Sequence, residues 1–216
     1  MDRTKDPARI VAVRALRGGR ARVQLNDGRD LLIGEDLRAR EGLEPGTELD
    51  DARLARLGLA STGEAAHEAA LGLLAYRARS AAEIRQRLER RGFEANTVAA
   101  EIERLQRAGL LDDGAFANAW VAERAALSPR GKRLLHSELR QRGIAAELSE
   151  AAVAGIDDTE TATALALRRA ARVDTADFRL FASRIGAFLM RRGFDHETAE
   201  QAVRTAWERL RTEKEG

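Results

Sequence analysis

The sequence lacks cysteine and has few aromatic residues. Without cysteine, the chain cannot form a disulfide or a thiolate metal site. Only 4% of the residues are aromatic while 44% are hydrophobic, so the core must consist mainly of leucine, alanine, valine and isoleucine, which favours packed helices. The first residues, MDRTKDP, lack the apolar stretch of a secretory signal, and no later segment is apolar over the length of a membrane span. We therefore expect a cytoplasmic protein that has no membrane partner.

Lysine is scarce as well, and the net charge is small. Of the 37 basic residues only Lys5, Lys132 and Lys214 are lysines, and the formal net charge is +2. This small charge argues against a protein that coats nucleic acid indiscriminately, so any attraction to polyanions must come from local clusters. The excess of arginine has two compatible explanations. One is the codon usage of a GC-rich genome, and the other is that the planar guanidinium binds two phosphate or carboxylate oxygens at once.

Residues 1–60 differ from the rest of the chain and predict a small β-rich N-terminal domain. Polar and apolar residues alternate over residues 20–25, and the flanking dipeptides Gly18-Gly19 and Asp27-Gly28 favour tight hairpin turns. Strands are predicted at residues 10–16, 20–25 and 29–33. A short helix is expected to follow near residues 36–41.

From Asp51 onward the spacing is helical, and an internal repeat dominates it. A glycine-containing hexapeptide recurs about every 50 residues, a period typical of stacked helical units, at Leu88–Phe93, Leu139–Ile144 and Leu189–Phe194. We expect Gly92, Gly143 and Gly193 to be left-handed residues just past a helix end. In such a Schellman cap the residue that follows the glycine contacts the leucine that lies four positions before the glycine. The paired basic residues before each glycine are expected to face outward, near the negative end of the helix.

Each repeat is expected to contain three helices, with the glycine-terminated helix in the middle. The first helices are predicted near residues 64–78, 113–127 and 159–172, and the third helices near 95–108, 146–154 and 196–211. The middle helices are expected to start at the capping box Ser80–Glu83, at Ser128-Pro129, and at Asp174 or Thr175. The predicted fold is mainly α, with a small N-terminal β-meander and tandem three-helix repeats that form an elongated curved array. The predicted repeats span residues 61–111, 112–157 and 158–216.

The second repeat carries the densest motif. It reads Gly-Leu-Leu-Asp-Asp-Gly-Ala-Phe-Ala-Asn-Ala-Trp-Val-Ala-Glu-Arg over residues 109–124 and continues through Gly131 and Glu138-Leu139 to Gly143-Ile144. This run closely resembles the central motif of the RecX family, and the similarity covers about residues 64–210. The β-rich N-terminal segment also resembles the extension of longer family members.

The resemblance implies a regulatory protein that has no enzymatic activity and needs no cofactor. RecX-like proteins lodge in the helical groove of the filament that the RecA recombinase forms on single-stranded DNA. There they restrain filament growth and depress ATP hydrolysis and strand exchange in recombination, DNA repair and the SOS response. They also contact DNA, so single- and double-stranded DNA are candidate partners. A rival interpretation is a helix-turn-helix-like DNA-binding protein that acts independently of RecA, because three-helix units with a short turn can imitate that motif.

A stripe of large side chains marks one face of the helix predicted at residues 113–127. Phe116, Trp120 and Arg124 are spaced four residues apart, and large residues at this spacing usually belong to the core. We therefore interpret Trp120 as a packing residue rather than a platform for stacking bases. Arg124 either forms an ion pair that locks two helices, which we favour, or projects towards a partner. Asp113 is expected to cap the helix.

Basic residues in all three repeats are the candidates for binding RecA or DNA. They are Arg85, Arg87, Arg90 and Arg91 in the first repeat, Arg124, Arg130, Lys132, Arg133, Arg140 and Arg142 in the second, and Arg191 and Arg192 in the third. Most basic residues on helices are simply solvated. The second repeat is favoured because Glu138 is the only acid between Arg130 and Arg142, so the repulsion there has no obvious local remedy.

No catalytic site, metal site or small-molecule substrate is predicted. The histidines lie far apart and lack the HExxH spacing; they are His67, His136 and His196. Gly131-Lys132 resembles the end of a phosphate loop, but Ala126 replaces the first glycine and Arg133 replaces the hydroxyl that binds Mg²⁺. The acid pairs at residues 112–113 and 157–158 fall at predicted helix starts, where helix capping explains them.

Overall fold

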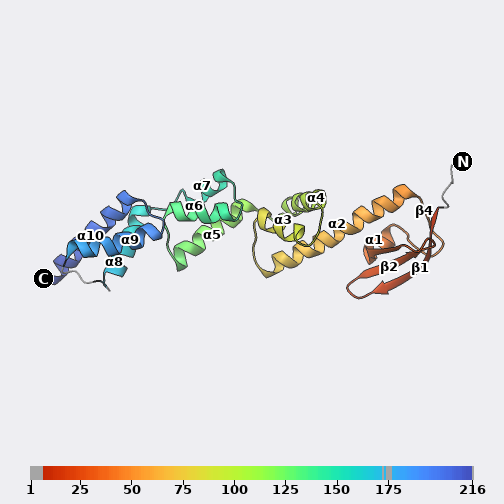
Figure 1. Ribbon diagram of the computed structural model, residues 1–216, viewed down its shortest axis with the longest axis horizontal. Coiled ribbons are helices and arrows are strands. Elements are labelled where there is room, and N and C mark those ends of the chain that lie inside the picture. Colours follow the sequence, from red (N-terminus) through yellow and green to blue (C-terminus); the bar gives the residue numbers. More distant parts are fainter. Residues whose placement is uncertain (1–6, 172, 174–176, 216) are drawn as a thin grey trace. The chain divides into compact units, whose positions relative to one another are not determined.

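The structure is a computed structural model that describes residues 7–171, 173 and 177–215 (Figure 1). These residues group into two compact units. One unit contains the described residues up to Arg77 together with Ile84–Ala108, and the other contains Ala78–Glu83 and the described residues from Gly109 onward. The chain is mainly helical, with a small antiparallel sheet followed by three tandem three-helix domains. The predicted mainly α fold with an N-terminal β-meander and tandem three-helix repeats is therefore confirmed.

The sheet has four strands in the order β3-β2-β1-β4, and all its pairings are antiparallel. The strands are β1 (Ala8–Leu16), β2 (Arg20–Leu25), β3 (Asp30–Gly34) and β4 (Glu48–Leu49). The alternation that predicted β2 places Ala21, Val23 and Leu25 in the core and their neighbours outside. Helix α1 (Glu35–Arg40) follows β3, close to its predicted place. Strand β4 was not predicted, because two residues are too few to show an alternating pattern.

Helix α2 (Asp51–Tyr76) starts much earlier than the predicted first helix, so that prediction is wrong at its N-terminal end. Asp50 caps the helix by accepting a hydrogen bond from the backbone N–H of Arg53. Leu54 and Leu57 are buried in the same hydrophobic core as the residues of the sheet. This packing stabilises the N-terminal turns of α2, which the sequence did not predict. The predicted boundary at residue 60 therefore falls inside a helix. Helices α3 (Ala81–Glu89) and α4 (Ala95–Arg107) complete the first three-helix domain.

The second and third three-helix domains lie in the second compact unit. Their helices are α5 (Asp113–Leu127), α6 (Lys132–Gln141) and α7 (Ala146–Val153), then α8 (Asp158–Ala170), α9 (Phe178–Arg191) and α10 (His196–Glu215). The core of the second domain contains Phe116, Ala117, Val121, Leu135, Leu139, Ile144 and Val153. The core of the third includes Phe181, Ile185, Leu189, Phe194, Ala202 and Val203. Each core therefore contains the leucine and the following apolar residue of the repeated hexapeptide.

The predicted glycine caps are confirmed in all three domains. Gly92, Gly143 and Gly193 have φ angles of 88°, 75° and 92°. After each glycine, a backbone N–H donates to the leucine carbonyl of the same hexapeptide, at N···O distances of 3.3 Å for Phe93, 3.0 Å for Ile144 and 3.3 Å for Phe194. The three leucines are fully buried. The hexapeptide thus ends each middle helix with a cap that its own sequence specifies.

The starts of the middle helices agree only in part with prediction. Ser80 caps α3, since its Oγ accepts a hydrogen bond from the backbone N–H of Glu83. The Ser128-Pro129 prediction is wrong, because Ser128 ends α5 and the N-cap residue of α6 is Gly131. The proposed caps Asp174 and Thr175 lie outside the described residues, and Asp177 caps α9 by accepting from the N–H groups of Arg179 and Leu180.

Two similar joints connect consecutive domains within the second unit. In the first joint, Ser80 Oγ donates to the Arg142 carbonyl at 2.5 Å, and Asp113 accepts from the Ala81 N–H at 2.8 Å. In the second, the Gly131 N–H donates to the Arg192 carbonyl at 3.0 Å. In both joints the start of one middle helix contacts the glycine turn that ends the next. Local signals could not reveal these contacts, because the partners lie far apart in the sequence.

The joints also explain the two acid pairs. Asp112 and Asp157 cap their own helices, whereas Asp113 and Asp158 accept hydrogen bonds from the middle helix of the preceding domain. The prediction that Asp113 caps its own helix is therefore wrong by one residue. Each pair accepts hydrogen bonds from the N-terminal N–H groups of two helices at once.

The second joint should be unusually sensitive to substitution at Gly193. A Cβ atom there would lie 2.3 Å from Leu134 Cβ and 2.7 Å from its backbone nitrogen, whereas one at Gly92 meets nothing within 4 Å. Both glycines have positive φ, so alanine costs about 1–2 kcal/mol at either position. We expect G193A to lose about 2 kcal/mol more than G92A, because the backbone at Leu134 must shift. Urea unfolding followed by circular dichroism measures both losses, and equal losses would contradict the close contact.

Candidate basic groove

A surface groove between α6 and α9 gathers three of the predicted basic residues. It has a volume of about 440 Å³ and is lined by Arg133, Leu134, His136, Ser137, Arg140, Met190, Arg191 and Gly193. The side chains of Arg133, Arg140 and Arg191 are exposed. Among the described residues that line it there is no carboxylate, so the groove concentrates positive charge although the net charge of the chain is small.

The amphipathic pattern of α6 and the second joint together create this groove. Arg133, Ser137 and Arg140 share one face of the helix, while Leu135 and Leu139 are buried on another. His136 contacts Ser149 Oγ of α7 through Nδ1 at 2.7 Å, which links α6 to α7. The joint places the last turn of α9 against the start of α6, and this brings Arg191 to the groove.

The three groove arginines differ from most other charged residues of the second unit. In the described part of the chain, no hydrogen bond or ion pair engages the guanidinium group of Arg133, Arg140 or Arg191. Like charges that converge without a counterion repel each other, and an anionic ligand relieves that repulsion. A guanidinium binds carboxylate and phosphate oxygens equally well by geometry. The groove is therefore suited to an acidic protein surface or to a nucleic-acid backbone.

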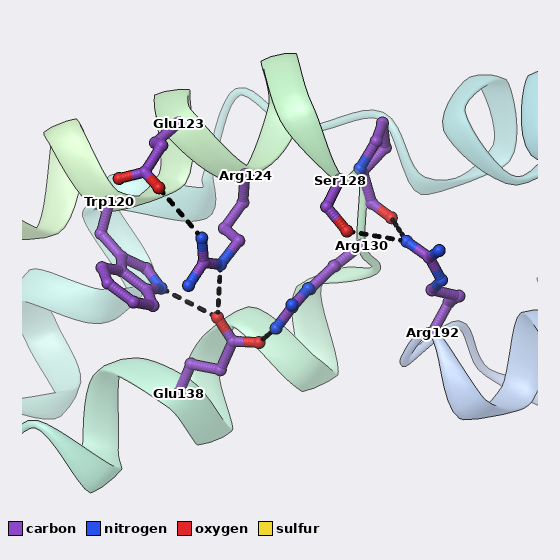
Figure 2. A network of polar contacts seen from close by, with 8 residues as sticks. Trp120, Glu123, Arg124, Ser128, Arg130, Glu138 and Arg192 are labelled. Carbon is purple, nitrogen blue, oxygen red and sulfur yellow. Dashed lines mark hydrogen bonds and ion pairs between the residues drawn. The ribbon is translucent and has the colours of Figure 1, made fainter.

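Glu138 holds a separate polar network between α5 and α6, which Figure 2 shows. Its Oε2 accepts hydrogen bonds from Trp120 Nε1 at 2.9 Å and from Arg124 Nε at 3.1 Å. Its Oε1 forms an ion pair with Arg130. The side chain of Glu138 is only 12% exposed. The sequence analysis did not predict that Glu138 would bind several basic side chains. The signal for this role was that Glu138 is the only acid between Arg130 and Arg142.

The network settles the roles of Arg124 and Trp120. Arg124 forms the ion pair between helices that the sequence favoured. The guanidinium carbons of Arg124 and Arg142 lie 3.9 and 3.7 Å from the centre of the Trp120 ring, in cation–π contact. Phe116 stacks beside Trp120 at 6.2 Å between ring centres. The interpretation of Trp120 as a packing residue is therefore confirmed.

Two further arginines serve the joints. Arg142 pairs with Glu83 at 2.7 Å, and Arg192 donates to Ser128 Oγ at 3.0 Å and to the Pro129 carbonyl at 3.3 Å. The expectation that both basic residues before each glycine face outward is wrong for these two, because each reaches back to the preceding domain.

Burial lowers the pKa of the Arg130 guanidinium, and the positive charges of Arg124 and Arg192 lower this pKa further.

The remaining basic candidates do not line the groove. Lys132 is half-buried at the start of α6, where its backbone N–H donates to Asp158. The candidates of the first domain are all exposed and lie in the first unit; they are Arg85, Arg87, Arg90 and Arg91. The groove residues Ser137, His136 and Met190 were not predicted. The sequence could have indicated them, because Ser137 and His136 lie within one helical turn of Arg133 and Met190 is adjacent to Arg191.

Residues 7–171, 173 and 177–215 contain no group of three or more histidine, aspartate or glutamate side chains placed to hold a metal ion. Within the same residues, none of the helices combines the length and the apolar character that a membrane crossing needs.

Asp158 gives the second joint a pH dependence. Burial raises the pKa of Asp158 above its usual value of 3.8, although the hydrogen bond from the Lys132 N–H opposes the shift. A carboxyl whose pKa is higher in the folded state disfavours folding once it is charged. The wild type should therefore lose stability relative to D158N as the pH rises from 3.8 through the raised pKa.

The D158N variant keeps an oxygen that can accept from Lys132, so it isolates the effect of charge from the loss of the hydrogen bond. Urea unfolding at several pH values measures the difference, and we expect it to grow with pH and then level off. D158A serves as the comparison that lacks the acceptor. A wild type that gains stability over D158N with rising pH would contradict the assignment.

The fold and the groove together define a class of protein. The chain is a tandem helical-repeat protein that carries a β-rich N-terminal segment and a basic surface groove between its second and third three-helix domains. Its residues 66–105, 112–153 and 156–203 match the family descriptions of the first, second and third three-helix domains of RecX. The protein belongs to the RecX family.

Curated relatives and solved structures agree with this assignment. The chain is 43% identical over 95 residues to the regulatory protein RecX of Mycolicibacterium vanbaalenii, covering 44% of this chain and 52% of that protein. It is 32% identical over 135 residues to the regulatory protein RecX of Chlorobaculum tepidum, covering 62% of this chain and 84% of that protein. The match thus spans about half the length of the first relative and most of the second.

Two solved structures share the fold. A crystal structure of regulatory protein RecX has a TM-score of 0.72 at 25% identity and covers 90% of this chain and 98% of its own. The crystal structure of RecX from Lactobacillus salivarius has a TM-score of 0.63 at 22% identity and covers 68% of this chain and 97% of its own. The second likeness is evidence for the fold alone.

Proposed function

We propose that this protein binds the filament of the RecA recombinase on single-stranded DNA and restrains its growth. In doing so it depresses ATP hydrolysis and strand exchange during recombination and DNA repair in the cytoplasm. Membership of a family of regulatory proteins supports the proposal. The observation that carries it is the set of three arginines that converge on one groove without a partner in the described chain.

The groove suits a filament as a target for a physical reason. Arg133 and Arg140 come from the second domain and Arg191 from the third, so two successive repeats contribute to one binding surface. Acidic groups on the partner would replace the mutual repulsion of the three cations by attraction. The internally paired residues Arg124, Arg130 and Arg142 would contribute indirectly, by holding the helices that present the groove.

A DNA-binding protein that acts without RecA is the second candidate, because three free guanidinium groups also fit phosphates. The two functions predict different dependences. Binding to naked DNA through phosphate contacts weakens steeply with salt and needs no recombinase. Regulation of the filament instead predicts that ATP hydrolysis by RecA falls at amounts of the protein well below one copy per RecA subunit.

The deciding experiment is a titration of the protein into RecA, ATP and single-stranded DNA, followed by phosphate release. We expect release to fall at amounts well below one copy per RecA subunit, since one bound copy can block extension of a long filament. Unchanged release when the protein equals RecA in amount would reject the proposal. Salt-sensitive binding to naked DNA together with unchanged release would favour the second candidate.

A further inference from the structure

The third domain has an apolar groove between α9 and α10. It has a volume of about 420 Å³, and small or apolar residues dominate its lining, among them Phe178, Ala182, Gly186, Met190 and Val203. Phe178 is 44% and Met190 37% exposed, so apolar surface remains in contact with water. Burying this surface against a ligand would be favourable.

The apolar groove occupies the helix face that carries the basic groove in the preceding domain. Ser183 and Met190 stand at the same distances before Gly193 as Arg133 and Arg140 stand before Gly143. The equivalent face of the middle helix is therefore basic in the second domain and apolar in the third. Met190 lines both grooves, so the two adjoin.

The charges of the apolar groove identify the kind of ligand. Its lining includes Glu200 and Arg204, which pair with each other at 2.6 Å, so Arg204 is not a free cation. A nucleic-acid strand carries a phosphate at every step. Among the described residues that line this groove the guanidinium is already paired with a carboxylate, which leaves His196 as the one further group that could carry a positive charge. A protein segment can place acidic side chains at one end and apolar side chains at the other. Only the protein segment complements both grooves.

We propose that the two adjoining grooves form one docking surface for an acidic amphipathic segment of a protein partner. Its carboxylates contact Arg133, Arg140 and Arg191, and its apolar side chains enter the groove between α9 and α10. The volume of each groove lies within the range of about 300–1,000 Å³ that is typical of ligand pockets. This inference rests on the proposed function, in that the segment belongs to the recombinase of the filament.

Gly186 provides a test that leaves the fold intact. A Cβ added at Gly186 meets nothing within 4 Å, and glycine inside a helix is about 1 kcal/mol less favourable than alanine. G186Q places a long polar side chain in the groove without changing the charge. The matched control is G72Q, which makes the same substitution inside helix α2, where a Cβ at Gly72 also meets nothing within 4 Å. Circular dichroism should show both variants at least as stable as the wild type.

The binding experiment uses the full chain and RecA filaments preassembled on single-stranded DNA, with naked single-stranded DNA in parallel. We expect G186Q to bind filaments about tenfold more weakly or worse, since one excluded apolar side chain is worth about 1.5–3 kcal/mol. G72Q should bind like the wild type, and neither variant should change binding to naked DNA. Unchanged filament binding by G186Q, or an equal loss on naked DNA, would overturn the inference.

The outcome can be separated from that of the proposed function. If the wild type binds filaments without reducing phosphate release, the regulatory function fails, and the comparison of G186Q with G72Q still decides the docking surface. If the wild type does not bind filaments at all, both proposals are overturned. If release falls but G186Q inhibits as well as G72Q, only the apolar subsite is wrong.

Discussion

The E138A variant should lose about 3 kcal/mol or more of folding stability. The substitution removes the acceptor of Trp120 and Arg124 and the counterion of Arg130. Arg124 and Arg130 are 19% and 26% exposed, so water replaces the lost carboxylate only in part. Removing one partner of a buried ion pair typically costs about 3–5 kcal/mol, because it leaves an uncompensated charge.

Urea unfolding followed by tryptophan fluorescence measures this loss directly, since Trp120 belongs to the network. The control is E123A, which removes a carboxylate that is 53% exposed and pairs with the same Arg124 at 3.2 Å. An exposed pair is worth about 1 kcal/mol at most. If E138A and E123A lose the same amount, Glu138 is not the centre of the network.

Reversing the charge of the three groove arginines should abolish regulation. We expect the variant R133E/R140E/R191E to bind RecA filaments about 100-fold more weakly or worse, because three favourable contacts become repulsive. Its fold should be preserved, since all three side chains are exposed and lack partners within the described residues. The measurement is the phosphate-release titration, supported by circular dichroism.

The control for this variant has the same change in net charge at another place. R14E/R17E/R56E reverses three exposed arginines of the first unit, none of which lines the groove. It should retain inhibition apart from a modest decrease in association rate. Equal losses in the two variants would mean that overall charge, and not the groove, determines binding.

Much of the fold was predictable because its signals are local. The hexapeptide contains both the left-handed glycine and the two residues of the hydrophobic cap, so the C-terminal ends of the three middle helices could be placed from sequence alone. The hairpin strands were equally clear from alternation and glycine turns. The start of α6 was missed because the local Ser128-Pro129 signal competes with a distant contact, the bond from Gly131 to the Arg192 carbonyl.

The sequence indicated that the site would be basic, but it did not indicate which of the basic residues would line the groove. The sequence identified twelve basic candidates, yet their availability depends on partners far along the chain. Arg142 and Arg192 reach partners 59 and 64 residues away, which no local pattern encodes. Arg133, Arg140 and Arg191 emerged as a group only after the ion pairs of the others were known and the joint had brought α9 to α6.

Site-specific photo-crosslinking tests the central claim most directly. A benzoylphenylalanine at Ser137 would lie in the basic groove, and one at Gln86 would occupy the equivalent position of the first domain. With RecA filaments on single-stranded DNA, we expect cross-links to RecA mainly from position 137. Cross-links from position 86 with none from position 137 would show that the groove between α6 and α9 is not the contact surface.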